Sequence, residues 1–187
     1  MKKILPVIIA KGHSSRLPGK NTKDFNGAPL FQWNLLKLMS LFDIVVVDSD
    51  DKNILKASKE MGAIPHTRHE KVIGNDIPSI LIFRSILEDF SDYDGVINVQ
   101  ANSPNVEPEL IKKAYNLISN DMSNHILTLN ENMTWNGSLW CISKELIYTL
   151  KDLYNIKPDM FLIDDSVDIH TEDEFKEALN RETKNVK

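Results

Sequence analysis

Short apolar runs alternate along this chain with stretches whose apolar residues recur at helical spacing. The run Ile4–Ala10 is apolar throughout, as is typical of a strand buried on both faces of a sheet. Alternation of strands and helices predicts an α/β fold, with a doubly wound, mostly parallel, Rossmann-like sheet in one domain over residues 1–187. Further strands are expected over 44–47, 63–67, 95–100, 126–129 and 138–142, and helices over 29–41, 51–61, 76–90, 108–119, 144–153 and 171–181.

Polar residues mark several of the expected boundaries. Asp51 and Asp76 are predicted N-caps, and Gly62 is placed to end the helix that follows Asp51. The sequence Thr171-Glu-Asp-Glu174 has the pattern of a capping box. Asn136-Gly137 is predicted to form a turn before a strand.

The predicted topology also indicates where a ligand would bind. In open α/β sheets, ligands lie beyond the carboxyl ends of the strands. This places segments 11–21, 48–51, 100–104 and the residues before Thr171 along one edge of the sheet.

Composition excludes several classes of protein. The net charge of −5 argues against nucleic-acid binding, which usually requires a basic surplus. The apolar stretch at the N-terminus is too short for a signal peptide, and no run reaches the roughly 18 apolar residues of a membrane span. We therefore expect a cytoplasmic protein with no membrane partner. Cys141 is the only cysteine and is expected to be an inert thiol in the core.

The segment from Ile8 to Asn21 reads IIAKGHSSRLPGKN and is the most informative part of the sequence. Gly12 lets the backbone approach an anion closely, and successive amides in such a turn can form an anion-binding nest. Lys11, Arg16 and Lys20 supply positive charge for phosphate oxygens. The spacing is neither that of a P-loop nor that of the dinucleotide-binding fingerprint. The alternative is a solvated basic loop.

This segment resembles the signature of the CMP-sugar synthetases, the cytidylyltransferases that activate acylneuraminate and KDO-type sugar acids. Further similarities follow in the family's order over nearly the whole chain. They are the stretches around Pro29, Asp48-Ser-Asp-Asp51, Gly62-Ala63 with Arg68, Asp76, Gln100-Ala-Asn-Ser-Pro104, Asn136-Gly-Ser138 and Asp168–Asp173.

The resemblance implies a homodimeric, magnesium-dependent nucleotidyltransferase. It would move CMP from CTP to an anionic acceptor, a sugar acid or a small phosphonate or phosphate, and release pyrophosphate. It also implies site roles. Lys11, Arg16 and Lys20 would act on the triphosphate; Ala10, Gly12, Ser14, Asn21, Arg68 and Asp76 would hold the nucleotide; Gln100, Asn102 and Asn136 would face the acceptor; and Asp168 would bind the metal.

Two departures from the family pattern stand out. His170 takes the place of the second of two closing aspartates, and Mg²⁺ prefers oxygen ligands, so His170 is expected beside the metal site or at the surface. The connection from Leu129 to Asn136 is short where the sialic-acid enzymes carry a long excursion, which indicates a smaller acceptor or a different dimer. Two rival functions remain open: transfer from another nucleoside triphosphate, and nucleotide binding by a catalytically weak regulator.

Other residues have plainer interpretations. Trp135 and Trp140 are expected in the core, although both flank the predicted acceptor turn. The acidic patch of Asp48, Asp50 and Asp51 is expected to cap the following helix and keep the sheet edge polar, with cation binding as the alternative.

Overall fold

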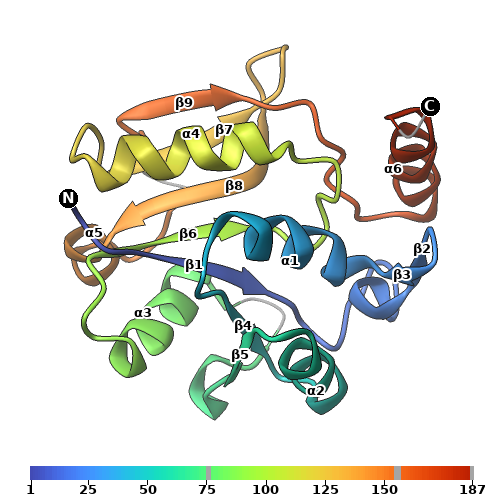
Figure 1. The fold of residues 1–187 in the computed structure, drawn as a ribbon, viewed down its shortest axis with the longest axis horizontal. Helices are drawn as coiled ribbons and strands as arrows, with labels where there is room; N and C mark the ends of the chain where they lie inside the picture. The colour runs from blue at the N-terminus through green and yellow to red at the C-terminus, as the bar shows by residue number, and fades with distance from the viewer. Residues whose placement is uncertain (75–76, 154–156, 186–187) are drawn as a thin grey trace.

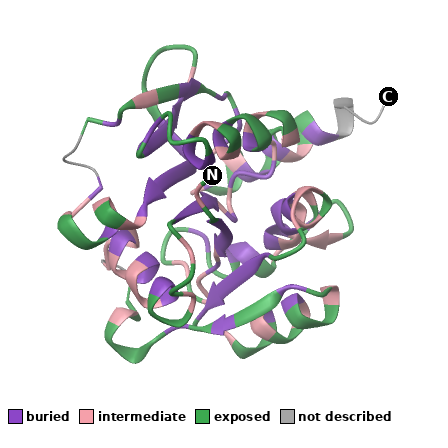
Figure 2. Cartoon of the chain, turned by 60° about the vertical axis from the view of Figure 1, so that its left-hand side comes forward, coloured by how far each residue is buried: buried purple, intermediate pink, exposed green. Residues whose placement is uncertain are grey.

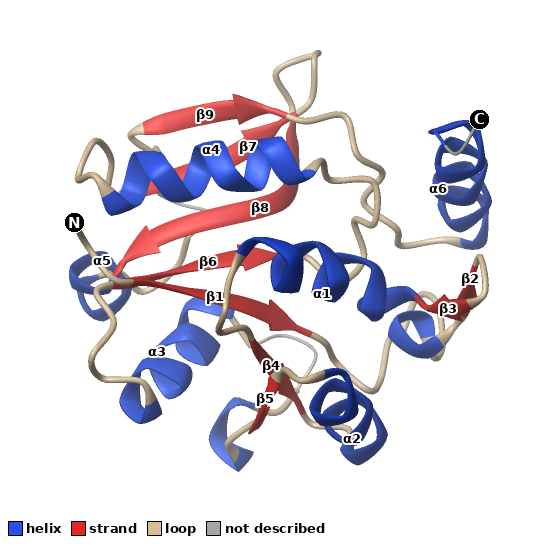
Figure 3. Ribbon diagram, viewed as in Figure 1, coloured by secondary structure: helices blue, strands red, loops and turns tan. Residues whose placement is uncertain are grey.

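The computed structural model describes residues 1–74, 77–153 and 157–185. A single large sheet crosses the molecule, with helices on both sides of it (Figures 1 and 3). In the order β5-β4-β1-β6-β8-β7-β9, its strands are Ile64–Thr67, Val46–Ser49, Ile4–Ile9, Gly95–Val99, Trp135–Ser143, His125–Leu129 and Met160–Ile163.

Six of these seven strands run in the same direction. The exception is β8, which pairs antiparallel with both β6 and β7. The pairs β1–β4, β1–β6, β4–β5 and β7–β9 are all parallel. The prediction of a mostly parallel sheet is therefore confirmed. Because β8 runs in the opposite direction, its first residues lie at the edge where its neighbours end.

Helices cover both faces of the sheet, and each face has its own core. One face packs against α1 (Leu30–Leu41), α2 (Lys52–Met61) and α4 (Pro108–Ser119), through residues that include Leu35, Ile54 and Ile111. The other face packs against α3 (Ser79–Asp89) and α5 (Lys144–Thr149), where Phe83 meets Trp140 edge-on. Figure 2 shows the buried strands between helices whose outer surfaces are exposed. This arrangement is the predicted doubly wound layering.

A third, smaller core lies beside the main sheet. It joins the hairpin of β2 (Asp24–Phe25) and β3 (Ala28–Pro29) to the last helix, α6 (Glu172–Asn185). Phe25 packs edge-on against Phe175, with ring centroids 5.4 Å apart. This contact holds the C-terminal helix against the segment that follows β1, as Figure 1 shows at the right of the molecule. Two 3₁₀ turns, Lys20–Thr22 and Glu70–Val72, complete the described elements.

Three of the predicted helix boundaries are confirmed in atomic detail. The Asp51 carboxylate accepts hydrogen bonds from the amides of Asn53 and Ile54. Gly62, with φ of 101°, ends the same helix in the left-handed conformation that glycine adopts without strain. At α6, Glu174 accepts from the Thr171 amide at 2.7 Å and the Thr171 hydroxyl accepts from the Glu174 amide at 3.3 Å, which is a reciprocal capping box.

Other predicted boundaries were wrong. The helix expected to be capped by Asp76 begins at Ser79, with Pro78 at the N-cap position; Asp76 itself lies outside the described residues. The predicted turn at Asn136-Gly137 is part of β8. The chain instead reverses over 130–134, where the Asn130 amide donates to the Thr134 carbonyl at 2.9 Å. The helix expected over 144–153 ends at Thr149. Strand β9 and the β2–β3 hairpin were not predicted.

In the described part of the chain, no helix has both the length and the apolar character needed to cross a membrane. Cys141 is fully buried on β8, and burial raises the pKa of its thiol well above the usual value. The interpretation of this residue as an inert core thiol agrees with both observations.

Candidate functional site

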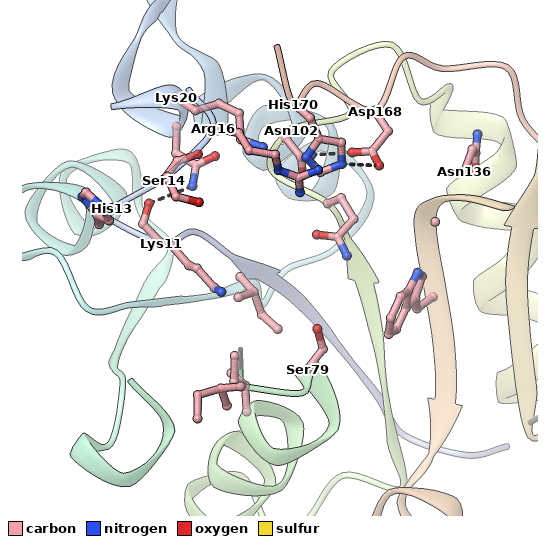
Figure 4. A pocket seen from close by; sticks show the side chains of 18 of the residues that line it. Lys11, His13, Ser14, Arg16, Lys20, Ser79, Asn102, Asn136, Asp168 and His170 are labelled. Carbon is pink, nitrogen blue, oxygen red and sulfur yellow. Dashed lines mark hydrogen bonds and ion pairs between the residues drawn. The ribbon is translucent and has the colours of Figure 1, made fainter. Parts of the chain in front are cut away.

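A cavity of about 620 Å³ opens at the edge of the sheet where the parallel strands end. This location is the one predicted from the topology. Five segments far apart in the sequence line it: the segment around the loop after β1, the beginning of α3, the loop after β6, the beginning of β8 and the segment after β9 (Figure 4). In chain order the residues are Ile9, Lys11, His13, Ser14, Ser15, Arg16, Lys20, Asn21, Ile77, Ser79, Ile82, Gln100, Asn102, Trp135, Asn136, Gly137, Trp140, Asp168 and His170.

The cavity brings together most of the residues selected from the sequence. Those that line it are Lys11, Ser14, Arg16, Lys20, Asn21, Gln100, Asn102, Asn136 and Asp168. The structure does not bring Ala10, Gly12 or Arg68 to the cavity wall, and Asp76 lies outside the described residues. Among the described residues that line the cavity, three lysine or arginine side chains face one carboxylate, that of Asp168. The cavity is therefore suited to an anionic ligand.

Gly12 has a different role from the one expected. Its φ is not in the left-handed region, so conformational freedom is not what requires glycine here. A Cβ at this position would lie 2.6 Å from the Cβ of Asp51, so glycine is needed for close approach to the start of α2. The Gly12 amide donates to the Asp50 carboxylate at 2.7 Å. Asp50 thus anchors the loop after β1 to the end of β4.

The amides that follow Gly12 are better placed for a ligand. Within the described part of the chain, the backbone N–H groups of residues 13–16 donate no hydrogen bond to another residue. An anion-binding nest requires successive backbone N–H groups that have no hydrogen-bond acceptor within the protein. Asn21 supports the same loop, because its side-chain amide donates to the Lys11 carbonyl at 2.8 Å. The Lys11 ammonium donates to the Gly74 carbonyl at 3.1 Å.

Lys20 is the most deeply buried cation of the loop, with 9% of its surface exposed. Its ammonium donates to the Ile169 carbonyl at 2.5 Å and so reaches the segment that carries Asp168. Burial lowers the pKa of Lys20 to about 8, with the charges of Arg16 and Lys11 acting in the same direction and Asp168 opposing them. A lysine with this pKa changes charge just above neutral pH.

This pKa predicts how the affinity for a polyphosphate depends on pH. Lys20 is charged below pH 8 and neutral above it, so affinity should be highest at pH 7 and fall as the pH rises to 9. Loss of one charged hydrogen bond should reduce affinity roughly tenfold. Calorimetric titration of CTP at pH 7, 8 and 9 measures this fall. A Lys20→Arg variant, whose side chain stays charged, is the control and should give a flat profile; a flat wild-type profile would contradict the prediction.

Arg68 lies in a buried ion pair and does not line the cavity. It is 2% exposed, and its Nε donates to Asp48 Oδ1 at 2.6 Å. Asp48 is fully buried and also contacts His66 Nδ1 through Oδ2 at 2.8 Å. Burial alone would lower the pKa of His66, but its hydrogen bonds to Asp48 and Asp89 and their charges outweigh this and raise it. Asp48 was expected, with Asp50 and Asp51, to cap a helix and keep the sheet edge polar. For Asp48 this was wrong, because it is fully buried at the centre of this cluster.

Asn136 is turned toward the protein interior rather than toward a ligand. Its side-chain NH₂ group donates to the Asp164 carbonyl and contacts Asp164 Oδ2, while its oxygen accepts from the amide and hydroxyl of Ser138. Asp164 was given no role in the sequence analysis. It is 8% exposed and also accepts from the hydroxyls of Ser138 and Ser166. Gly137, with φ of 62°, lets the backbone of β8 depart from regular pairing at this point.

Two tryptophans form a wall of the cavity next to Asn136. Trp140 is buried as expected, but Trp135 is 40% exposed and meets Trp140 edge-on with ring centroids 5.4 Å apart. The expectation that Trp135 lies in the core was therefore wrong. The irregular start of β8 turns this ring outward, and the sequence carried no signal for the irregularity except Gly137. Ser79 and Ile82, at the beginning of α3, also line the cavity and were not selected from the sequence.

Asp168 lines the same cavity as the basic loop and is held on both oxygens. Asn102 donates to Oδ1, and His170 Nε2 lies 2.8 Å from Oδ2 (Figure 4). In the described residues, no group of three or more His, Cys, Asp or Glu side chains is arranged to hold a metal ion. A nucleotide-borne Mg²⁺ needs only one or two protein carboxylates, because phosphate oxygens and waters complete its coordination. The donor set fits such an ion once Asp168 releases a hydrogen bond.

Comparison with known proteins identifies the family. The sequence model of the cytidylyltransferase family matches residues 6–144 of this chain. The chain belongs to the cytidylyltransferase family. The match runs from the first strand to the start of α5 and so includes the loop after β1 and the beginning of β8, although the segment carrying Asp168 lies beyond it.

Curated relatives of this chain include enzymes named for their action on sugar acids. Pseudaminic acid cytidylyltransferase of Campylobacter jejuni is 29% identical over 136 residues, covering 69% of this chain and 59% of the relative. The 3-deoxy-manno-octulosonate cytidylyltransferase of Colwellia psychrerythraea is 31% identical over 127 residues, covering 66% and 44%. The chain thus matches only part of the length of these relatives.

Solved structures share the fold of this chain at low sequence identity. CMP:2-keto-3-deoxy-manno-octonic acid synthetase complexed with CTP superimposes with a TM-score of 0.76 at 12% identity, covering 98% of this chain and 99% of that structure. A manganese complex of a Mycobacterium tuberculosis protein gives 0.71 at 12% identity, covering 95% and 98%. At this identity the likeness establishes the doubly wound nucleotidyltransferase fold.

Proposed function

We propose that this chain transfers CMP from CTP to an anionic acceptor and releases pyrophosphate. The observation that carries the proposal is the set of three cations and unpaired amides on the loop after β1, in a cavity that also contains Asp168. Family membership supports the choice of CTP. The acceptor class is a sugar acid or a small phosphonate or phosphate, and the short reversal over 130–134 favours a compact acceptor.

The chemistry is an in-line displacement at the α-phosphorus of CTP. An acceptor oxygen forms a bond to that phosphorus while the bond to the oxygen bridging the α- and β-phosphates breaks, and that oxygen leaves with pyrophosphate. The amides of residues 13–16, together with Lys11, Arg16 and Lys20, bind the triphosphate and stabilise the charge that grows on the departing group. Positioning of the two reactants supplies much of the remaining rate enhancement.

Asp168 is the residue proposed to hold the divalent ion, with Asn102 fixing one of its oxygens. When bound, the ion screens the phosphate charges and polarises the α-phosphate. Gln100 and Asn102 line the same cavity as the basic loop and the two tryptophans, so they are proposed to contact the acceptor. The side-chain amide of Asn136 donates to Asp164, so Asn136 is proposed to support the acceptor site indirectly, by holding the start of β8 in place.

The proposal is tested by measuring pyrophosphate release with CTP, UTP, GTP and ATP against a panel of sugar acids and small phosphonates. We expect release with CTP and one acceptor class. Equal release with all four nucleotides would contradict the choice of CTP. Binding of CTP by calorimetry with no pyrophosphate release from any acceptor would instead support a regulatory nucleotide-binding protein.

Asp168→Asn should raise the metal concentration needed for half-maximal activity by at least about tenfold, because it removes the proposed carboxylate ligand. The rate is measured as a function of Mg²⁺ and Mn²⁺ concentration at saturating CTP. Asp165→Asn is the control, since Asp165 lies nearby at the surface and does not line the cavity. If Asp168→Asn lowers only the thermal unfolding temperature, the carboxylate is structural and the assignment fails.

The resemblance to CMP-sugar synthetases further implies a homodimer, and we include this state in the proposal. Light scattering coupled to gel filtration measures it directly. A mass near 21.3 kDa would indicate a monomer and contradict this part of the proposal.

A further inference from the structure

The feature that points beyond the proposed function is the pairing of a carboxylate with an imidazole inside the cavity. Asp168 Oδ2 and His170 Nε2 are 2.8 Å apart, and both side chains line the cavity. About a third of each side chain is exposed, 34% for Asp168 and 30% for His170. Both are therefore accessible to a ligand in the cavity.

The surrounding contacts fix this pair in place. The side-chain amide of Asn102 donates to the other oxygen of Asp168 and to the Ile169 carbonyl. The backbone carbonyl of Asn102 accepts from the Ile169 amide at 2.9 Å. The His170 amide donates to Glu174 at 2.8 Å, which ties it to the first turn of α6. The Asp168 carboxylate is thus held by the loop after β6, and the His170 backbone is held by Glu174 of the capping box of α6.

The distance between Asp168 Oδ2 and His170 Nε2 is similar to the distance between two neighbouring ligand atoms on one metal ion. Adjacent donors around an octahedral ion with bonds of about 2.1 Å are about 3 Å apart, since they subtend a right angle. In the present arrangement the two atoms lie within hydrogen-bond distance of each other. A divalent ion bound by both atoms would take the place of this hydrogen bond, with Nε2 as the ligand atom of the imidazole.

We infer that Asp168 and His170 together form a mixed oxygen and nitrogen site that prefers a first-row transition-metal ion such as Mn²⁺ to Mg²⁺. Mg²⁺ is a hard cation that takes oxygen ligands, whereas imidazole is a good ligand for transition-metal ions. The remaining positions would be filled by CTP phosphate oxygens and water, which Mn²⁺ accepts as readily as Mg²⁺ does. The inference rests on the proposed CTP site and adds to it the identity of the ion.

The direct test is pulsed electron paramagnetic resonance of Mn²⁺ bound to the full chain with CTP and no acceptor. Electron spin-echo envelope modulation detects a ¹⁴N nucleus coordinated to Mn²⁺. We expect nitrogen modulation in the wild type and its loss in His170→Asn. His13→Asn is the matched control, because His13 also lines the cavity and its replacement should leave the modulation unchanged. Wild-type spectra without nitrogen modulation would overturn the inference.

A competition titration gives a second readout. Mg²⁺ is added to the Mn²⁺–CTP–protein complex, and released Mn²⁺ is followed by its sharp free-ion signal. His170→Asp supplies an all-oxygen pair, so the ratio of Mn²⁺ to Mg²⁺ affinity should fall at least about tenfold relative to wild type, on the scale seen when a metal-site residue is changed. An unchanged ratio would overturn the inference. Thermal unfolding of each variant checks that it is folded.

The outcome separates this inference from the proposed function. CTP affinity is measured on the same samples by calorimetry, and pyrophosphate release is measured separately with Mg²⁺. If CTP binds and is turned over but the spectra show no coordinated nitrogen, the inference fails and the proposed function stands. If CTP does not bind, the proposed function fails and the inference falls with it.

Discussion

Replacing Lys20 by alanine should reduce the rate of CMP transfer by roughly 30- to 1000-fold, equivalent to about 2–4 kcal/mol of activation free energy. Lys20 is 9% exposed, and its ammonium donates to the Ile169 carbonyl in the segment that carries Asp168. A preorganised cation in this position acts on charge that develops on the leaving pyrophosphate. The rate is measured at saturating CTP and acceptor, with thermal unfolding as a check on folding.

Lys23→Ala is the matched control for Lys20. Lys23 is three residues away, pairs with Glu172 at 2.6 Å and does not line the cavity. Its loss should change the rate less than about twofold, because an exposed ion pair contributes at most about 1 kcal/mol and only to stability. Equal effects of the two substitutions, or a normal rate for Lys20→Ala, would remove Lys20 from the mechanism.

Replacing Arg68 by alanine should lower the free energy of unfolding by about 3–5 kcal/mol, because it leaves the Asp48 carboxylate buried without its cation. Asp48 is fully buried and bound by both Nε and Nη2 of Arg68. The measurement is chemical denaturation of the wild type and the variant. The same contacts place Arg68 away from the cavity, so we expect the folded variant to keep most of its affinity for CTP.

Two further variants test this explanation. Lys56→Ala removes an exposed pair with Glu60 at 3.8 Å and should cost less than about 1 kcal/mol. In the double variant Asp48→Asn with Arg68→Met, the unpaired charge is gone, so part of the lost stability should return. If Arg68→Ala instead leaves stability unchanged and abolishes CTP binding, Arg68 contacts the nucleotide as the sequence resemblance implied.

The parts of the fold that follow from local chemistry were predictable from the sequence. The strand Ile4–Ile9 is a continuous apolar run, and the caps Asp51, Gly62 and Thr171 use backbone contacts within a few residues. These features depend only on residues close together in the chain, so they can be predicted from the sequence. The topology rule then located the cavity, because it depends only on the order of strands and helices.

The orientation of individual side chains could not be predicted, because it depends on partners far apart in the sequence. The ion pair of Arg68 with Asp48 spans 20 residues, and the engagement of Asn136 by Asp164 spans 28. Asn136-Gly137 has the composition of a turn, yet β8 continues through it, because β7 pairs with β8 at Trp135 and again at Trp140. Short motifs thus identified which residues gather at the site but not which atoms face the ligand.

The central claim is that the loop after β1 binds the triphosphate of CTP, and a crystal structure with CTP and Mn²⁺ tests it most directly. We expect the phosphate oxygens against the amides of residues 13–16 and within hydrogen-bond distance of Lys11 or Lys20, with the ion beside Asp168. Phosphates bound elsewhere, with this loop unchanged and neither Lys11 nor Lys20 in contact with them, would contradict the account.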